Sequence, residues 1–268
     1  MEFSPALFLS EDDLPASSVI PDLLILNQPI ANFDVFERLW QHTRFRICAD
    51  GGANRLYDMF NGDLEHVRPK FLPSIIHGDL DSLRDDVRRY YSHQGVQISQ
   101  DLDQYSTDFG KAMEKIMSVD SSLPRREILV LGTLSGRVDQ GLGLLHEMIR
   151  EETQNLGVRI WLFSETNVSF IMRKGRNTVL TGLSGEYFTR NVGIIPIFGP
   201  AVITTSGLEW DVKSWATQMG HQISTSNHIV EENIYVETDA HVLFTIERAS
   251  ELPTKTEIRE AITNGRAI

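Results

Sequence analysis

Two aspartates, Asp79 and Asp81, follow a short apolar segment that ends at Ile76. In an extended segment, residues two positions apart project from the same side, so both carboxylates would face one point. Neighbouring carboxylates repel each other unless a cation lies between them. Mg²⁺ prefers oxygen ligands and often shares them with a substrate phosphate, so this pair could hold a metal. An alternative is a turn in which Asp81 or Ser82 caps a helix and Asp79 is solvated.

A second acidic turn lies shortly after the first. Asp101 and Asp103 precede Thr107 and Asp108, and a helical apolar spacing begins at Asp108. Helix capping explains this turn from local sequence alone. A second metal-binding turn is the competing interpretation.

Glycine-rich turns follow two other apolar segments. The turn Asp50-Gly51-Gly52-Ala53-Asn54 follows one of them and opens a predicted helix, where free backbone N–H groups could face an anion. The turn Gly132-Thr133-Leu134-Ser135-Gly136-Arg137 adds hydroxyls and an arginine able to grip phosphate. Arg137 could equally form a surface ion pair with Asp139. The sequence contains neither G-x-G-x-x-G nor G-x-x-x-x-G-K-[ST], so both common nucleotide-binding motifs are absent.

The C-terminal part of the chain holds two polar segments that could bind a small ligand, Thr204 to Asp211 and Ile223 to Asn227. Trp210 lies within the first segment. A strand tryptophan is more often a core residue. Its alternative role is a flat wall for a cationic ligand, because a ring face attracts positive charge.

The elements that must position these residues differ between the two halves. Short apolar segments alternate with helical patterns from Asp22 to about Arg173, which predicts an α/β domain with a mostly parallel sheet. The predicted strands are 23–26, 45–49, 74–76, 128–131 and 160–163, and the predicted helices are 82–90, with Ser82 and Asp85 as a capping box, 108–117 and 141–150. Ligands of such sheets collect at the carboxyl ends of the strands, where the polar turns lie.

After Lys174 the helical spacing ends, and short β-branched or aromatic segments alternate with turns. This pattern predicts an all-β sandwich, with domains at 1–173 and 174–268. The predicted strands are 178–180, 186–189, 193–197, 201–205, 208–212, 222–226, 234–238 and 242–246.

Composition narrows the possible partners. The formal net charge of -12 disfavours nucleic acid, because a negative field repels phosphodiesters. No apolar run reaches 18 residues, so no membrane span is expected. The acidic residues near Met1 are unlike a signal peptide, and a cytoplasmic location follows by default. The histidines lack metal-binding spacing, and no G-x-S-x-G motif supports serine hydrolase chemistry.

The motifs, taken together and in order, resemble those of eukaryotic thiamine pyrophosphokinases over about residues 20 to 248. They are 48–56, 77–82, 104–108, 131–140, 206–210 and 224–227. The resemblance implies a homodimer with an N-terminal α/β domain and a C-terminal β-sandwich. It also implies transfer of the pyrophosphoryl group of ATP to the hydroxyl of thiamine, with AMP leaving.

The resemblance further implies roles for individual residues. Asp79, Asp81 and Asp108 match positions that hold Mg²⁺ and the ATP phosphates, and Arg137 would add positive charge. Other positions of the nucleotide and substrate cleft are matched by Asp50, Gln104, Thr107 and Asp139. The thiamine-facing wall, which in this family comes from the partner subunit, is matched by Ser206, Trp210, Ser224, Ser226 and Asn227.

Two rival hypotheses use the same residues. A Mg²⁺-dependent phosphohydrolase or an ordinary γ-kinase could use the aspartates but would release phosphate or ADP instead of AMP. In the second hypothesis, the protein only binds a small ligand through its β half, and the aspartates have no chemical role.

Overall fold

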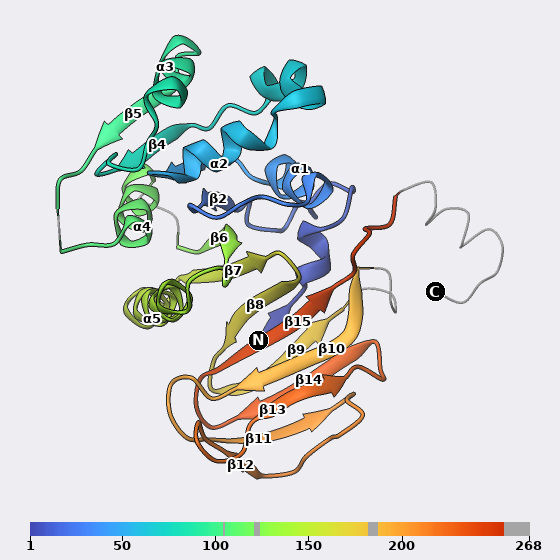
Figure 1. The fold of residues 1–268 in the computed structure, drawn as a ribbon. Helices are drawn as coiled ribbons and strands as arrows, with labels where there is room; N and C mark the ends of the chain where they lie inside the picture. Colours follow the sequence, from blue (N-terminus) through green and yellow to red (C-terminus); the bar gives the residue numbers. More distant parts are fainter. Residues whose placement is uncertain (104, 121–123, 182–186, 255–268) are drawn as a thin grey trace. The chain divides into compact units, whose positions relative to one another are not determined.

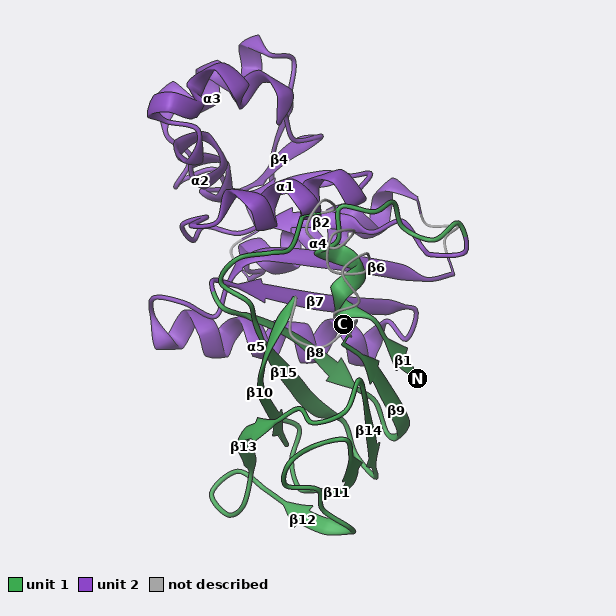
Figure 2. Ribbon diagram, turned by 90° about the vertical axis from the view of Figure 1, so that its right-hand side faces the viewer, with its two compact units in different colours: residues 1–16, 166–268 green, residues 17–165 purple. Residues whose placement is uncertain are grey.

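The computed structural model describes residues 1–103, 105–120, 124–181 and 187–254. The chain divides into two compact units, Ser17–Glu165 and Met1–Ala16 together with Thr166–Ile268 (Figure 2). They are called the α/β unit and the β unit below. The predicted boundary lay at 173/174, with the N-terminal residues in the first domain.

Strand pairing explains this difference. β8 (Asn167–Met172) pairs antiparallel with β15 (Val242–Arg248), so the β unit begins before residue 174. β1 (Glu2–Phe3) pairs in parallel with β9 (Gly175–Leu180), which brings the N-terminal residues into the same unit. A two-residue strand leaves too weak a pattern to be recognised in sequence.

The α/β unit contains six strands in the order β7-β6-β2-β3-β4-β5, and every neighbouring pair is parallel (Figure 1). The strands are β2 (Asp22–Ile25), β3 (Arg46–Ala49), β4 (Ile75–Gly78), β5 (Gln97–Gln100), β6 (Arg126–Thr133) and β7 (Val158–Ser164). All five predicted strands are present. The edge strand β5 was missed because its sequence, Gln-Ile-Ser-Gln, has one apolar residue.

Helices connect these parallel strands. They are α1 (Phe33–His42), α2 (Gly52–Met59), the 3-10 segment η2 (Gly62–Lys70), α3 (Asp85–His93), α4 (Asp108–Val119) and α5 (Val138–Gln154). The prediction of a capping box at Ser82 and Asp85 is wrong. Arg84 is the N-cap of α3 and caps it with no side-chain hydrogen bond, while the Ser82 backbone N–H donates to Asp50.

The core of the α/β unit lies on both faces of the sheet. Leu23, Leu24 and Ile25 are completely buried along β2. A strand with both faces covered must be apolar at successive positions, which explains the unbroken apolar segments in the sequence. Thr107 begins α4 by accepting a hydrogen bond from the Gly110 N–H at 3.1 Å, a standard N-cap arrangement.

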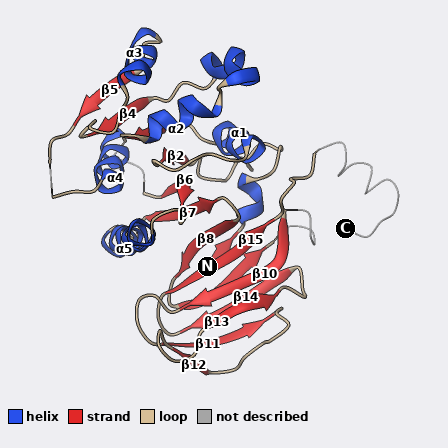
Figure 3. Cartoon of the chain, in the orientation of Figure 1, coloured by secondary structure: helices blue, strands red, loops and turns tan. Residues whose placement is uncertain are grey.

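The β unit is built from two sheets, ordered β1-β9-β14-β11-β12 and β13-β10-β15-β8. Its remaining elements are η1 (Pro5–Phe8), β10 (Phe188–Ile195), β11 (Ala201–Ser206), β12 (Trp215–Thr217), β13 (Ser224–His228) and β14 (Asn233–Thr238). Phe3 of the first sheet stacks on Phe170 of the second, with ring centroids 4.6 Å apart. The two sheets therefore face each other across a buried core, and the predicted sandwich is confirmed (Figure 3).

One predicted strand of the β unit is a turn instead. Residues 208–212 make a single isolated bridge, between Leu208 and Ile229. The Asp211 carboxylate accepts hydrogen bonds from the backbone N–H of Gly207 and of Leu208 and from the Thr205 hydroxyl, at 2.9 to 3.2 Å. This turn lets Trp210 leave the sheet. Among the described helices of the whole chain, none is long and apolar enough to cross a membrane.

Candidate active site

Three carboxylates meet at the carboxyl edge of the parallel sheet. Asp50 follows β3, Asp79 follows β4, and Asp108 is the first residue of α4. One oxygen of each lies within 4.8 Å of the others. Ala49 is in register with His77, and the Asp50 N–H donates to the His77 carbonyl at 3.0 Å. Pairing of β3 with β4 thus aligns the first two aspartates, and we call the three residues the acidic cluster.

The charges of the acidic cluster oppose one another. Burial and, after it, the charges of the nearby Asp50 and Asp79 together raise the pKa of Asp108 to about 6. Burial also raises the pKa of Asp50, against the hydrogen bonds it receives from Ser82. Burial alone would raise the pKa of Asp79 as well, but the hydrogen bonds from Lys111 and Asp81 and the charge of Lys111 together outweigh it, and the pKa is lowered. The cluster therefore gathers more negative charge than its surroundings compensate.

The acidic cluster fits a divalent cation. Asp50 uses Oδ2 to accept the Ser82 N–H at 3.1 Å. Its Oδ1 is buried and has no hydrogen-bond partner among the described residues. A buried carboxylate oxygen without a donor is costly unless a cation approaches it. Three hard oxygen donors from separate loops suit Mg²⁺, which binds a few carboxylates and completes its shell with water or phosphate.

Asp81 lies beside the acidic cluster and outside it. Leu80 adopts a left-handed conformation with φ of 65°, so the segment is not extended, and the expectation that Asp79 and Asp81 project from one side does not hold. The exposed Asp81 accepts a hydrogen bond from the Ser82 hydroxyl at 3.0 Å. Its charge still raises the pKa of Asp50 and Asp108.

Lys111, a buried cation at the same site, was not predicted from sequence. Its side chain is 1% exposed, and its Nζ lies 3.1 Å from Asp79 Oδ2. The lysine follows Asp108 by three positions, which places both on one face of α4. That spacing could have placed Lys111 near the aspartates. The neighbouring apolar residues of α4 instead indicated a face buried in the core.

A cleft of about 270 Å³ opens beside Asp108. Loops at the ends of β2 and β6 and the first turns of α4 and α5 line it; its residues include Asn27, Gln28, Thr107, Asp108, Ser135, Asp139 and Glu147. The predicted convergence of polar turns is thus observed within the α/β unit. Gln104, which was predicted to belong to this region, lies outside the described residues.

Arg137 forms the ion pair with Asp139 in this structure. Its Nη2 lies 2.6 Å from Asp139 Oδ2, and the two side chains are 74% and 62% exposed. An exposed pair of this kind is worth little and exchanges partners readily.

The glycine pair after Asp50 serves packing. A Cβ on Gly52 would lie 2.2 Å from the Ile25 carbonyl oxygen, and one on Gly51 would lie 2.3 Å from the Asn27 amide. A side chain at Gly52 would push α2 away from the end of β2, and one at Gly51 would displace the Asn27 side chain.

The predicted residues of the β unit form a second, separate group. Trp210 is 54% exposed and is therefore not a core residue. Its backbone N–H donates to Asn227 Oδ1 at 3.1 Å, and Asn227 Nδ2 donates to its carbonyl at 3.0 Å. Asn227 is buried, so it holds the tryptophan backbone firmly. Ser206, the last residue of β11, and Ser226, in the middle of β13, are exposed, and Ser224, the first residue of β13, is half-buried.

Sequence analysis also missed the neighbours of the Trp210 ring. The His228 ring lies 5.1 Å from it, centroid to centroid, and His228 Nδ1 lies 2.7 Å from Glu209 Oε2. His228 carries no motif in sequence, and only the pairing of residues 208–209 with 228–229 brings it here.

Comparison with known proteins identifies the class to which both units belong. Residues 36–162 match the family model of the thiamin pyrophosphokinase catalytic domain, and residues 176–243 match that of the thiamin pyrophosphokinase vitamin B1 binding domain. Both ranges fall within single units.

Individual relatives agree with this. Thiamine pyrophosphokinase 1 of Arabidopsis thaliana is 35% identical over 235 residues, which cover 84% of this chain and 85% of the relative. Thiamine pyrophosphokinase of Saccharomyces cerevisiae is 30% identical over 273 residues, or 84% of each chain. A crystal structure of yeast thiamin pyrophosphokinase matches with a TM-score of 0.84 at 26% identity, covering 93% of this chain and 91% of the yeast chain. The chain belongs to the thiamine pyrophosphokinase family.

Proposed function

We propose that this protein transfers the pyrophosphoryl group of ATP to the hydroxyl of thiamine and releases thiamine diphosphate and AMP. Family membership supports this reaction. The observation that carries it in the structure is the acidic cluster, whose oxygens lie within 4.8 Å at the edge where ligands of parallel sheets bind.

Asp50, Asp79 and Asp108 would hold Mg²⁺, with Asp81 adding negative charge beside them. The ion would supply positive charge to the phosphate oxygens of ATP as the bond to AMP breaks. Lys111 keeps Asp79 ionised through its hydrogen bond and contributes a second positive charge. Phosphoryl transfer depends on positioning and charge neutralisation, which agrees with a site of carboxylates and one buried lysine.

The cleft beside Asp108 would hold the nucleotide. Thr107, Asp139 and Gln28 line it and offer donors and acceptors to the sugar and base, as Gln104 would on the basis of the family motif. Arg137 lies at the surface next to Asp139 and can leave that exposed pair for a phosphate oxygen, which it would bind through two N–H groups.

The β unit would recognise thiamine. The exposed ring of Trp210 can face the cationic thiazolium, and Ser206, Ser224 and Ser226 offer hydroxyls beside it. Asn227 would act by holding Trp210. We further propose a cytoplasmic homodimer in which the Trp210 surface of one subunit completes the cleft of its partner.

Product analysis tests the reaction. The purified protein is incubated with ATP, Mg²⁺ and thiamine, and the products are separated by mass. AMP and thiamine diphosphate in equal amounts are expected. ADP would indicate a γ-kinase, and free phosphate a hydrolase; either result would refute the proposal.

Substitution of Asp79 tests the metal site against the hypothesis of a binding protein. Asp79→Asn should remove nearly all turnover, because the ion loses a charged ligand, while circular dichroism stays native. Asp239→Asn, which alters a carboxylate of the β unit bound to a backbone N–H, is the control for a general loss of charge. Unchanged turnover in Asp79→Asn would show that Asp79 has no role in the reaction. A wild type that binds thiamine without turnover, and an Asp79→Asn variant that binds it equally well, would support the binding protein.

A further inference from the structure

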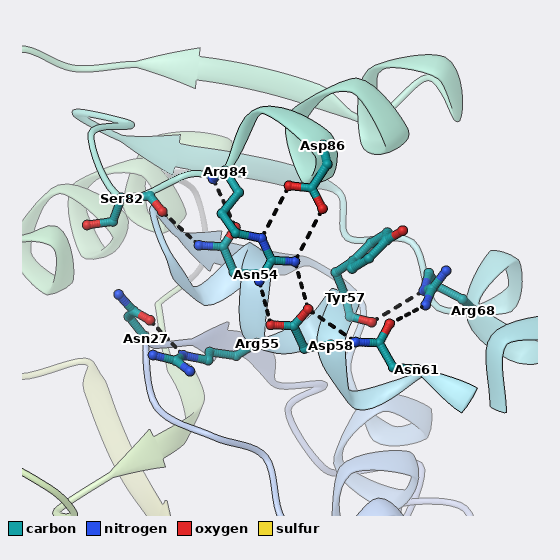
Figure 4. Close-up of polar contacts among 10 residues, drawn as sticks. All are labelled: Asn27, Asn54, Arg55, Tyr57, Asp58, Asn61, Arg68, Ser82, Arg84 and Asp86. Carbon is teal, nitrogen blue, oxygen red and sulfur yellow. Dashed lines mark hydrogen bonds and ion pairs between the residues drawn. The ribbon is translucent and has the colours of Figure 1, made fainter. Parts of the chain in front are cut away.

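One face of α2 is tied to the segment that follows Asp79. Asp50, Asn54 and Asp58 are spaced four residues apart, so they line one side of the helix and its N-terminal turn. Each contacts the segment from Ser82 to Arg84, as Figure 4 shows for the last two. The first belongs to the acidic cluster, while the other two lie outside it.

Asn54 forms the central connection. Its Nδ2 donates to the Ser82 carbonyl at 2.7 Å, and its Oδ1 accepts the Arg84 N–H at 3.1 Å. The asparagine is buried, at 8% exposure. The donor and the acceptor of its amide group therefore both bind the backbone of the segment from Ser82 to Arg84, which fixes the distance of that segment from α2.

Arg84 and Asp58 form the outer connection. Arg84 Nη1 and Nη2 each lie 2.7 Å from one oxygen of Asp58, a two-point contact that fixes the planes of both groups. Asp86 adds a contact to Arg84 Nε at 3.2 Å. The two side chains of the main pair are 42% and 35% exposed, so the pair by itself contributes little to folding stability.

The end of α2 that carries Asp58 is itself braced. Arg68 places its guanidinium 3.9 Å above the Tyr57 ring and donates to the Tyr57 carbonyl and to Asn61. Asn61 in turn donates to Asp58 at 3.4 Å. Asp58 therefore presents its carboxylate to Arg84 from a fixed position.

This arrangement opposes the repulsion within the acidic cluster. Asp50 immediately precedes the N-cap of α2, and Asp79 lies three residues before Ser82, where the segment that Asn54 and Asp58 hold against α2 begins. If the segment were free to move, separation of the two carboxylates would lower their Coulomb energy. Lys111 and the Gln100 side chain, which donates to the Asp79 carbonyl at 2.7 Å, hold Asp79 from the opposite side.

We propose that Asn54, Asp58 and Arg84 are positioning residues that set the divalent-cation affinity of the acidic cluster. The inference rests on the proposed function of that cluster as a metal site. These three residues, called the α2 clamp, lie outside the acidic cluster. They act by keeping Asp79 close to Asp50 when no ion is bound, so that binding requires little rearrangement.

The test measures Mn²⁺ binding by electron paramagnetic resonance for the full chain without nucleotide. The variants are Asp58→Asn, Arg84→Gln, the double variant and, for the inner connection, Asn54→Ser. Arg88→Gln is the matched control, because it removes an exposed arginine of α3 whose side chain makes no hydrogen bond or ion pair among the described residues. Loss of a side chain that hydrogen-bonds a metal ligand typically weakens metal binding about 10–100-fold. The α2 clamp acts one contact further from the ligands, so we expect the lower end of that range.

The dissociation constant for Mn²⁺ should rise about tenfold in each single variant of the pair. It should rise no further in the double variant, because both changes remove the same contact. The Mg²⁺ concentration needed for half-maximal turnover should rise by the same factor, while kcat at saturating Mg²⁺ stays near the wild-type value. A general structural defect would lower kcat as well.

Other outcomes are decisive in the opposite direction. If Asp58→Asn and Arg84→Gln bind Mn²⁺ as tightly as the wild type while Asp79→Asn does not bind it, the α2 clamp has no such role and the proposed metal site stands. If the wild-type protein itself does not bind Mn²⁺, the metal site fails and the inference with it. A tenfold weakening in Arg88→Gln would show that net charge, not the clamp, governs the affinity.

Discussion

Asp108→Asn should make the metal-free protein more stable at alkaline pH. In the native state the carboxyl pKa of Asp108 is raised to about 6, first by burial and then by Asp50 and Asp79. An aspartate in an unfolded chain has a pKa of about 3.9. The asparagine keeps the shape of the side chain and removes the charge that the folded site disfavours.

The sign and size follow from proton linkage. The native state binds this proton more tightly than the unfolded state, so the stabilising contribution is complete below about pH 3.9 and is lost as the pH rises through about 6. One pKa unit corresponds to about 1.36 kcal/mol, so the full difference is about 3 kcal/mol at pH 8. Because Asp108 is only partly buried and shares its pKa shift with its neighbours, we expect about half of that. The asparagine also lacks the attraction of a carboxylate to the positive N-terminus of α4, which subtracts about 0.3–1 kcal/mol from the gain in stability. The net gain is about 1 kcal/mol.

The assay is urea unfolding of both proteins in excess EDTA at pH 4 and pH 8. The variant should be more stable at pH 8 and equal to the wild type near pH 4. Saturating Mg²⁺ should reverse the order at pH 8, because a ligand at 100 times its dissociation constant stabilises the wild type by about 2.7 kcal/mol and the variant binds it poorly.

Two results would refute this reasoning. If Asp108→Asn is no more stable than the wild type at pH 8 without metal, the charge of Asp108 does not destabilise the folded protein. If Mg²⁺ stabilises both proteins equally, Asp108 is not a ligand of the ion.

Three further substitutions test single residues. Lys111→Met should lower the metal-free melting temperature, because Asp79 loses its cation. Mg²⁺ should raise the melting temperature of this variant more than that of the wild type. If the substitution lowers the melting temperature equally with and without Mg²⁺, Lys111 only fills the core. Arg137→Ala should leave the urea midpoint unchanged, since its pair is exposed, and should raise KM for ATP about tenfold if it grips a phosphate; an unchanged KM would leave only the surface ion pair. Trp210→Ala should raise KM for thiamine far more than KM for ATP with little change in stability, and equal effects on both constants would argue against a thiamine-facing ring.

Several features of the fold could be predicted from sequence for a clear reason. Strands buried on both faces must be apolar at successive positions, so 23–26 and 128–131 were identifiable without tertiary information. The apolar spacing of α4, beginning at Asp108, followed from the helical period. The short strands β1 and β12 have two and three residues and leave no such pattern.

The composition of the acidic cluster required the folded chain. Asp50 and Asp108 are 58 positions apart in sequence, and the pairing of β3 with β4 and the packing of α4 bring them together. Asp81 was predicted to share the site and lies beside the acidic cluster, because the backbone is left-handed at Leu80 and the next residues, from Ser82 on, contact Asp50 and Asn54. Those contacts span about thirty residues, and local spacing contains no information about them.

The sequence by itself determined the kinds of element, the edge at which polar turns collect, and the family. These depend on local periodicity and on motifs that are contiguous along the chain. Only the tertiary structure decided which carboxylates share a site, that Lys111 is buried against Asp79, and that Trp210 is exposed. Each of these is the result of contacts between distant segments, and the free energy of such contacts depends on distances that exist only after the chain has folded.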